Sequence, residues 1–385
     1  MNTNSKKICI FPNDPIIAYY NKGEIKNKYY NPLDFFDEVH IISFIDNDIE
    51  ESKVQSLVGN AKLKIYCVGK ANLKNYKSFE ENISQLIKKI NPDIIRAYNA
   101  LVQGWLASKI AKKLNIPIVI SLHTNYEQQR KEAKNKRNLF RYLKLVYASK
   151  KLEKPVLENA DAVICVYDFI VPYAKNMGAK NISVIYNKVD LNKFSPKQSK
   201  EFNSSKPIIL SVGRLIDQKD HSILIRSIKD LDVELIIIGD GPNYQKLLDL
   251  IKRLKVANKV KIIKKIANDE LNKYYASCDI YAQPMMNLGG IPMPVLEAMA
   301  SGLPVIMSKK EGNEIIDDAI LFVENDPNQF QKAIKKILLD NDFRNKLIKK
   351  GLEIIREIDA SKMDEKEVEL YKKLININNK KYRHD

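Results

Sequence analysis

Two successive series of short apolar segments alternate with amphipathic segments, and this alternation limits the possible folds more than any other feature. The segments of the first series are rich in valine and isoleucine and cover residues 7–11, 38–44, 63–69, 93–99, 116–123, 161–167 and 182–187. Helical periodicity separates them, as at residues 79–90 and 103–114. Continuous Val/Ile strands divided by helices are typical of a parallel sheet that is buried on both faces.

The second series repeats the pattern. Its predicted strands cover residues 207–213, 233–239, 259–265, 279–284, 303–308 and 319–324. Its predicted helices cover residues 220–230, 243–255, 268–277, 294–301, 327–339, 341–356 and 361–378. A chain of 385 residues is long for one core. The sequence therefore predicts an α/β protein with two Rossmann-like, doubly wound domains.

Composition places the domain boundaries. Residues 195–206 are polar, rich in Ser and Lys and flanked by prolines, so we predict an interdomain linker there. The first domain then covers residues 1–194 and the second covers residues 207–356. The remaining residues, 357–385, are expected to form a C-terminal helix that packs back on the first domain.

Charge and hydropathy narrow the partners and the compartment. The 64 Lys and Arg against 47 Asp and Glu leave a net charge of +17, which favours nucleotides, acidic lipid headgroups or nucleic acid. No apolar run is long enough to predict a transmembrane helix, and the start "MNTNSKKICIF" lacks the pattern of a signal peptide. A cytoplasmic protein with reduced, buried thiols is expected from the unpaired spacing of its cysteines, Cys9, Cys67, Cys165 and Cys278.

Three glycine-containing turns follow predicted strands of the second domain, where ligands bind in open parallel sheets. The first, "SVGRLIDQKDH", has Gly213 at the turn and then Arg214 and Lys219 on one loop. A guanidinium and an ammonium that leave the same strand end can hold a diphosphate between them. Two solvated surface charges would produce the same pattern.

The second turn, "IIIGDGP", contains Gly241. Its two glycines do not make the dinucleotide fingerprint, so a nicotinamide site is not indicated, and a plain strand-to-helix turn fits equally well.

The third turn lies in "GGIPMPVLEAMASGLPV", residues 289–305, and enters a helix near Pro294. A helix start offers amide donors and a positive dipole end to a phosphate. Glu297, one turn into this helix, can accept hydrogen bonds from a ribose diol, although a surface helix also carries such carboxylates.

These turns, in this order, resemble the C-terminal domain of the family-4 retaining glycosyltransferases of GT-B fold. The segments "SVGRLIDQKD", "IIIGDGP", "LNKYYASCDIYAQP" and "PMPVLEAMASGLPVI" carry the likeness. In the first half, "INPDIIRAYNALVQGWLASKIAKKLNIPIVISLHT" and "ENADAVICVY" are similar to that family's N-terminal domain. The resemblance implies two Rossmann-like domains that face a central cleft, and the transfer of a sugar from a UDP- or GDP-linked donor.

The resemblance also implies the roles of individual residues. Arg214 and Lys219 would bind the donor diphosphate and act in catalysis, and Glu297 would bind the ribose. His123, at the end of a predicted strand of the first domain, would face the donor sugar as a catalytic residue. The other expected donor-site residues, several of them through backbone amides, are Gly213, Gly241, Gly289, Gly290, Ile291, Met293 and Val295.

The sequence departs from the family pattern at three places. The family has two glutamates with seven residues between them; the second is Glu297, but Gly289 occupies the position of the first. That glutamate contacts donor-sugar hydroxyls, so its loss predicts a slower enzyme or a different sugar, with Asn287 as a replacement contact. The glycine-rich loop after the first strand is absent, and the family's "NGVD" is "NKVD" at residues 187–190.

The family chemistry needs no metal, and we expect none. In front-face transfer the leaving diphosphate helps to deprotonate the acceptor, and the protein stabilises the departing negative charge. Residues 46–48, "DND", have the Asp-x-Asp spacing of a metal site in another glycosyltransferase fold. They lie in a polar loop after the second predicted strand, so we interpret them as structural.

Residues 126–154 contain ten Lys and Arg against three Glu, a net charge of 10 − 3 = +7. Phe140, Leu143 and Tyr147 follow helical spacing within this segment. A basic amphipathic helix of this kind can lie on an anionic membrane, and a solvated helix remains the alternative. A membrane position would suit a lipid-linked acceptor in the synthesis of cell-surface polysaccharide, with the enzyme peripheral on the inner face.

Three other functions remain open on the sequence. A catalytically weakened subunit that binds nucleotide sugar or a partner is suggested by Gly289. A sugar-nucleotide epimerase could use the same architecture without an acceptor. A nucleic-acid binder fits the charge, but no aromatic-basic motif or reading helix supports it, so no nucleic acid is expected.

Overall fold

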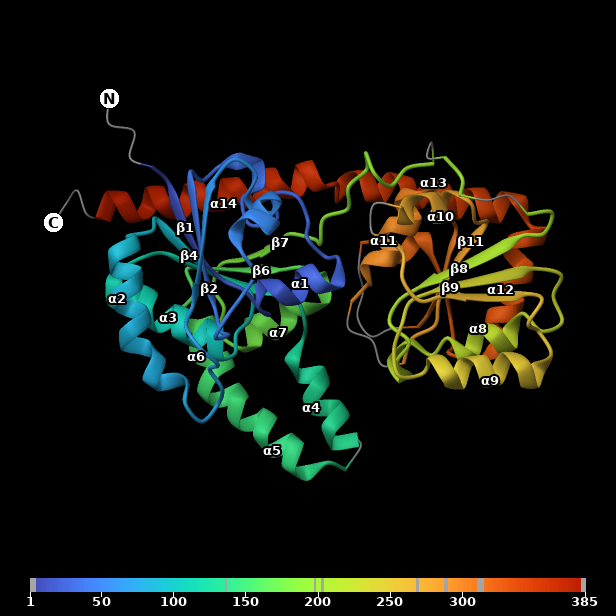
Figure 1. Ribbon diagram of the computed structural model, residues 1–385, viewed down its shortest axis with the longest axis horizontal. Helices are drawn as coiled ribbons and strands as arrows, with labels where there is room; N and C mark the ends of the chain where they lie inside the picture. Colours follow the sequence, from blue (N-terminus) through green and yellow to red (C-terminus); the bar gives the residue numbers. More distant parts are fainter. Residues whose placement is uncertain are drawn as a thin grey trace. The chain divides into compact units, whose positions relative to one another are not determined.

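The chain forms two compact units (Figure 1). The computed structural model describes residues 5–135, 137–196, 199–201, 204–267, 270–286, 290–309 and 315–381. The first unit contains Met1–Tyr186 together with Ser361–Asp385, and the second contains Asn187–Ala360. Each unit is an α/β layer structure around its own parallel sheet.

The first unit contains a seven-stranded parallel sheet with the order β3-β2-β1-β4-β5-β6-β7. Its strands are β1 (Lys7–Phe11), β2 (Glu38–Ser43), β3 (Lys62–Cys67), β4 (Ile94–Ala97), β5 (Ile118–Leu122), β6 (Ala162–Cys165) and β7 (Ile182–Val184). The strand order reverses between β1 and β4, and a ligand crevice is expected at the carboxyl ends beside such a reversal.

Helices flank this sheet, and Figure 1 shows α14 running along the first unit. They are α1 (Ile16–Lys22), α2 (Glu80–Ile90), α3 (Val102–Leu114), α4 (Tyr126–Asn135), α5 (Leu139–Ala148), α6 (Lys154–Glu158), α7 (Val171–Asn176) and α14 (Ala360–Lys381). The ring of Tyr371 in α14 packs edge-on against Phe36 with centroids 5.3 Å apart. Arg96 of β4 forms a buried ion pair with Glu367 of the same helix. These contacts hold α14 in the first unit.

The second unit repeats the design with six parallel strands in the order β10-β9-β8-β11-β12-β13. They are β8 (Ile208–Val212), β9 (Glu234–Ile238), β10 (Val260–Ile263), β11 (Ile280–Gln283), β12 (Val305–Ser308) and β13 (Ile320–Val323). The helices are α8 (Ser222–Ser227), α9 (Tyr244–Leu254), α10 (Leu271–Ala276), α11 (Met293–Ala300), α12 (Pro327–Leu339) and α13 (Asn341–Glu357).

The sheet of the second unit lies between two helix layers. Figure 1 shows α8 and α9 on one side and α10, α11 and α13 on the other. Leu224 of α8, Leu247 of α9 and Phe330 of α12 join Leu235 and Ile237 of β9 in one buried cluster. The strand order reverses between β8 and β11, so the ends of these two strands are the expected ligand crevice of this unit.

All thirteen predicted strands are present, but the predicted boundary between the domains needs correction. The second unit begins at Asn187, so residues 187–194 do not belong to the first domain. The ring of Phe194 packs on Tyr275 at 5.7 Å. The described part of the predicted linker, residues 195–206, is also held to the second unit, since the amide of Glu201 donates to Ser277 Oγ and Lys206 pairs with Asp232.

The basic segment 126–154 contains more than the amphipathic helix indicated by the spacing of Phe140, Leu143 and Tyr147, which all lie in α5. It contains α4, then α5, and then a π-helical stretch, Ser149–Glu153, that leads into α6. The side chain of Asn138 caps α5 by accepting a hydrogen bond from the amide of Arg141. Helices α4 and α5 therefore form a hairpin.

The prediction for the cysteines is also wrong in one respect. Cys9, Cys165 and Cys278 are buried free thiols, but Cys67 is exposed. It lies at the end of β3, an edge strand, where alternate residues face solvent.

Candidate functional site

The first two glycine turns of the second unit are joined by backbone hydrogen bonds. The amide of Gly213 donates to Ile238 O at 2.9 Å, and the amide of Leu215 donates to Asp240 O at 2.9 Å. A Cβ atom at Gly239 would lie 2.0 Å from Gly213 O, and one at Gly241 would lie 2.5 Å from Leu215 O. Only glycine allows this approach, so these residues bring the carboxyl ends of β8 and β9 together.

Arg214 and Lys219 leave this paired turn as a cationic pair. The ammonium of Lys219 contacts Met285 Sδ at 3.6 Å, and its alkyl stem lies against Gly213. Arg214 is exposed. Within the described residues neither side chain has a carboxylate within ion-pair distance, so no carboxylate of the described part neutralises the pair. Burial, with a further contribution from Arg214, lowers the pKa of Lys219 to about 8. The pair is suited to an anion such as a diphosphate.

The loop after β11 is attached to the same turn. The amide of Met286 donates to Gln218 O at 2.9 Å, and the amide of Met285 donates to Ser308 Oγ at 3.0 Å. The ends of β8, β9 and β11 thus form one continuous edge of loops. Gly289 and Asn287, which the sequence singled out, lie outside the described residues.

Beyond these residues the chain turns into α11. Gly290 has a left-handed φ of +69°, and Pro292 precedes the helix. Both Gly290 and Ile291 are buried. The backbone amide of Val295 was predicted to bind the sugar donor. It instead donates a hydrogen bond to Pro292 O at 2.9 Å, within the turn itself. Met293 is the first residue of α11 and presents its amide at the helix start.

Glu297 is held by a tyrosine that sequence analysis did not identify. The hydroxyl of Tyr275, in α10, donates to Glu297 Oε2 at 2.9 Å. The Tyr275 ring lies 5.9 Å from that of Tyr281 in β11, whose hydroxyl is 3.3 Å from Val212 O at the end of β8. Buried tyrosines therefore connect the carboxylate to the strand ends that carry the cationic pair. The pattern "LNKYYASCDIY" contained both tyrosines but did not indicate which face they occupy.

In the first unit, His123 follows β5 and is neutral at physiological pH. Its ring stacks on Tyr98 with centroids 5.8 Å apart and 22° between the planes. The guanidinium of Arg96 lies 4.5 Å from the centroid of the same tyrosine ring. Burial and the nearby Arg96 lower the pKa of His123 to about 4. Its buried Nε2 has no hydrogen-bond partner in the described part of the chain.

Two further tyrosines complete an aromatic cluster around His123. Tyr29 and Tyr30 contact Tyr98 with centroid distances of 5.7 and 5.4 Å. They come from the segment "NKYYN", which occupies the region where the family has its glycine-rich loop. The cluster lies at the carboxyl ends of β4 and β5, where the first unit is expected to bind a ligand.

The Asp-x-Asp pattern at residues 46–48 makes structural contacts. Asp48 accepts hydrogen bonds from the amides of Ile16 and Ile17 at 2.9 and 2.6 Å, so it caps the start of α1. Asp46 instead pairs with Lys70. In the described ranges, no group of three or more His, Cys, Asp or Glu residues could hold a metal ion. The start of α1 is thus occupied by a carboxylate of the chain itself.

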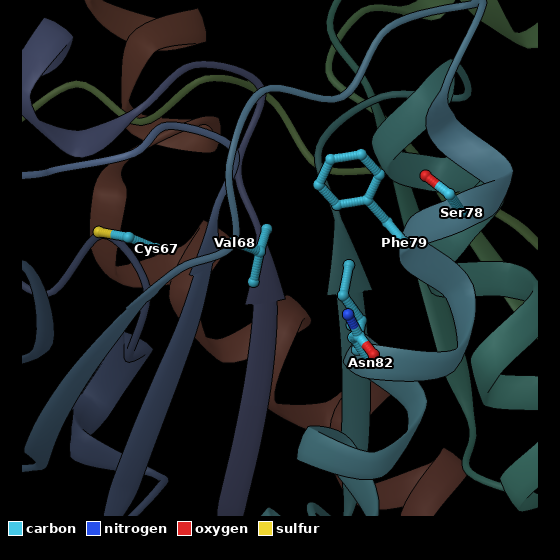
Figure 2. Close-up of a pocket in the computed structure, with 6 residues that line it drawn as sticks. Cys67, Val68, Ser78, Phe79 and Asn82 are labelled. Atoms are coloured by element: carbon cyan, nitrogen blue, oxygen red, sulfur yellow. The ribbon is translucent and has the colours of Figure 1, made fainter.

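A surface hollow of about 370 Å³ lies elsewhere in the first unit (Figure 2). Cys67 and Val68, at the end of β3, line it together with Ser78, Phe79 and Asn82. Because β3 is the edge strand, this hollow is separate from the carboxyl ends of β4 and β5. It contains none of the residues predicted for the site.

Comparisons with known proteins identify the family of both units. The family described as Glycosyltransferase Family 4 matches residues 37–193, and Glycosyl transferases group 1 matches residues 192–353. An uncharacterised glycosyltransferase of Methanocaldococcus jannaschii is 27% identical over 333 residues, which cover 84% of this chain and 87% of the relative.

Two further relatives are informative. The UDP-Gal:alpha-D-GlcNAc-diphosphoundecaprenol alpha-1,3-galactosyltransferase of Escherichia coli is 26% identical over 355 residues, which cover 84% of this chain and 85% of that protein. The solved structure of sucrose-phosphate synthase from Thermosynechococcus elongatus has a TM-score of 0.74 at 18% identity and covers 97% of this chain and 100% of its own. At that identity the likeness concerns the fold.

Proposed function

Since the chain belongs to the family-4, group 1 glycosyltransferases, we propose that it transfers a sugar from a UDP- or GDP-linked donor to a glycan or lipid-linked acceptor. The observation that carries the proposal is the cationic pair of Arg214 and Lys219 on the joined ends of β8 and β9. A nucleoside diphosphate carries the opposite charge. The glycines at 239 and 241 let the two turns approach each other closely, which fixes the backbone from which the pair projects.

Within this proposal the cationic pair stabilises the leaving diphosphate. The bond between the anomeric carbon of the sugar and the diphosphate oxygen breaks, and negative charge develops on that oxygen. Positive groups fixed nearby lower the energy barrier of this step. The start of α11 adds amide donors and the positive end of its dipole. The proposed transfer retains the anomeric configuration and needs no metal, because the cations of the chain perform the task that a divalent ion would perform.

The proposal gives Glu297 and His123 separate tasks. Glu297, already oriented by Tyr275, accepts hydrogen bonds from the ribose hydroxyls. His123 contacts a hydroxyl of the donor sugar, and its low pKa keeps it a neutral hydrogen-bonding group rather than a cation. The resemblance of both positions to the family pattern supports these assignments.

We extend the proposal to the acceptor and to the place of action. The E. coli relative is named for a sugar linked to diphosphoundecaprenol, a polyprenyl lipid. By analogy, the acceptor here is a lipid-linked sugar for cell-surface polysaccharide, and the enzyme works in the cytoplasm, peripherally on the inner face of the membrane. The transferred sugar is a hexose. No helix in the described ranges is long and apolar enough to cross a bilayer.

A weakened subunit is the second candidate, because Gly289 replaces the first family glutamate. Loss of one charge-assisted hydrogen bond in the transition state slows a reaction by roughly 10- to 150-fold, which leaves measurable turnover. Slow release of the nucleotide from its sugar by the purified protein would support the enzyme. A protein that binds donor but never releases nucleotide, with or without a lipid-linked acceptor, would support the subunit.

The direct test is a thermal-shift screen of UDP-, GDP- and ADP-sugars, followed by calorimetry with the best donor. Arg214→Ala and Lys219→Ala should each weaken binding by roughly 10- to 150-fold, because each removes a charge-assisted contact. Lys252→Ala, which changes an exposed lysine of α9 in the same unit, is the matched control and should leave the affinity unchanged. Equal losses in all three variants, or no donor bound at all, would contradict the proposal.

A further inference from the structure

Helix α5 exposes large apolar side chains to an unusual degree. Phe140 is 83% exposed and Leu139 is 67% exposed, and Leu143 and Tyr147 are each more than half exposed. Ten large hydrophobic side chains of the described residues are exposed in this way, and four of them lie in these ten residues of helix. The other six are scattered singly over the chain, as is normal for a protein surface. A cluster of this kind marks a surface that binds something.

The four side chains lie on one face of the helix. At about 100° per residue, Leu139, Leu143, Tyr147 and Phe140 fall within an arc of about 100°. Tyr142, Leu145 and Val146 lie outside this arc and are partly buried, and α5 packs against α4. The exposed arc is therefore not the face that holds the hairpin together.

Positive charge borders this apolar face. Lys144 is exposed in α5 just beyond the edge of the arc, Arg141 is exposed on the side that meets α4, and Lys150 and Lys151 follow in the π-helical stretch. Residues 134–151 contain seven Lys and Arg and no Asp or Glu. The nearest carboxylate on α4 is Glu132, which forms an ion pair with Arg141 at 3.8 Å. The partner of this face must accept both apolar side chains and a high density of cations.

The base of the hairpin is fixed to the body of the first unit. Arg130 of α4 binds both carboxylate oxygens of Glu153 at 3.0 and 2.8 Å, and the hydroxyl of Tyr173 in α7 donates to the same carboxylate. Glu153 is 1% exposed. These charge-assisted bonds, both donated by Arg130 Nη1, and the bond from Tyr173 connect the base of the hairpin to α7. The hairpin that carries the apolar face of α5 is thus anchored at its base.

We propose that α5 binds the surface of an anionic lipid bilayer, with Leu139, Phe140, Leu143 and Tyr147 in the interface and the lysines and arginines on the headgroups. Apolar burial and attraction to anionic lipid together give the usual binding of an interfacial helix. A second copy of the chain is a poorer partner, because it would bring the same positive charge against this face. The purpose of such docking, access to a lipid-linked acceptor, rests on the proposed function. The evidence for docking, which is the exposed apolar face and the charge of α5, is independent of that function.

The test is co-sedimentation of the purified chain with vesicles of phosphatidylcholine alone and of phosphatidylcholine mixed with phosphatidylglycerol. The unaltered chain should bind the mixed vesicles, and high salt should weaken that binding. Phe140→Ser combined with Leu143→Ser should lower the partition coefficient by roughly tenfold or more, because two apolar side chains no longer enter the interface. Lys144→Gln combined with Lys151→Gln should lower the partition coefficient for the vesicles that contain phosphatidylglycerol but not for phosphatidylcholine alone, because these lysines act through their charge.

The matched control is Leu339→Ser, since Leu339 is 84% exposed but lies on α12 in the second unit. It should bind vesicles as the unaltered chain does. All variants should keep their unfolding temperature and their response to UDP-sugar, which separates failure of docking from failure of the donor site. Equal binding to neutral vesicles, or an unchanged partition after the Phe140 and Leu143 substitutions, would overturn the proposal. Self-association that these substitutions abolish would instead identify a second copy as the partner.

Discussion

The hydroxyl of Tyr275 donates a hydrogen bond to the carboxylate of Glu297 at 2.9 Å. Tyr275 is completely buried, and burial next to that carboxylate raises its pKa well above the ordinary value, so the hydroxyl keeps its proton and remains a donor. Through Tyr281 the same tyrosine is in contact with the end of β8. Tyr275 is thus a positioning residue for the proposed ribose contact.

Replacing Tyr275 by Phe should weaken donor binding by roughly tenfold, equivalent to about 1.4 kcal/mol, because Glu297 loses the bond that orients it. Calorimetry with UDP-sugar measures the effect. In a Glu297→Ala background, Tyr275→Phe should have no further effect on affinity, as expected when one residue acts through another. Tyr173→Phe, which removes a comparable hydroxyl–carboxylate bond in the first unit, should leave affinity unchanged. An additive double variant would contradict the positioning role.

Lys219 should make donor binding depend on pH. Its pKa in the nucleotide-free protein is about 8, against an ordinary value of 10.5, so the ammonium loses its proton as the pH rises above 8. Affinity for a UDP-sugar, whose phosphates do not titrate in this range, should then be constant from pH 6 to 7 and fall by up to about tenfold per unit above pH 8. Lys219→Arg should bind with a flat profile over this range, since a guanidinium stays charged. A falling profile in that variant would assign the pH dependence to another group.

The same pKa predicts the opposite trend for the stability of the nucleotide-free chain. Between pH 8 and 10.5 the unfolded state carries the Lys219 proton and the folded state does not, so stability rises with pH across this window. Thermal unfolding without ligand should show this rise, and Lys219→Met should remove it. The cationic site therefore costs stability at neutral pH, where donor binding is strongest.

The strands and the cationic pair could be predicted from the sequence because both depend on local patterns. A run such as "ELIII", followed by glycine, specifies a buried strand and a turn within a few residues. The parallel order of the sheet then brings Arg214 and Lys219 to the same edge as the turn after β9. No distant contact has to be known for this step.

The supporting residues could not be predicted, because their partners lie far away in the chain. Arg96 lies in the predicted strand 93–99, and nothing near it in the sequence indicates its partner Glu367, 271 residues later. Tyr98 gave no signal of its ring contact with His123. The spacing of Phe140, Leu143 and Tyr147 indicated a helix within residues 126–154, but it gave no sign of the separate helix α4 or of the cap at Asn138 where α5 begins. Such features depend on tertiary contacts that outweigh local pattern.

Gly239→Ala should disrupt the joined turns of β8 and β9. The new Cβ would lie 2.0 Å from Gly213 O, and the backbone at residue 239 has a φ of +153°, which favours glycine. We expect the unfolding temperature of the second unit to fall by roughly 5–10 °C and UDP affinity to fall with it. Gly351→Ala is the control, since its Cβ meets only Met299 at an ordinary 3.7 Å within α13. That variant should gain about 0.5–1 kcal/mol.

The ion pair of Arg96 and Glu367 should dominate the stability of the first unit. Both side chains are almost fully buried, and Glu367→Gln would leave the guanidinium without its counter-charge. Breaking such a pair costs about 3–5 kcal/mol, whereas replacing both partners by apolar residues is often nearly neutral. The double variant Arg96→Met with Glu367→Met should therefore recover most of the stability that Glu367→Gln loses. Urea unfolding followed by the fluorescence of Trp105, the single tryptophan and part of α3, measures the stability of this unit. Glu324→Gln, in the exposed pair with Lys309, should cost under about 1 kcal/mol, and an equal cost for Glu367→Gln would contradict the proposed weight of the buried pair.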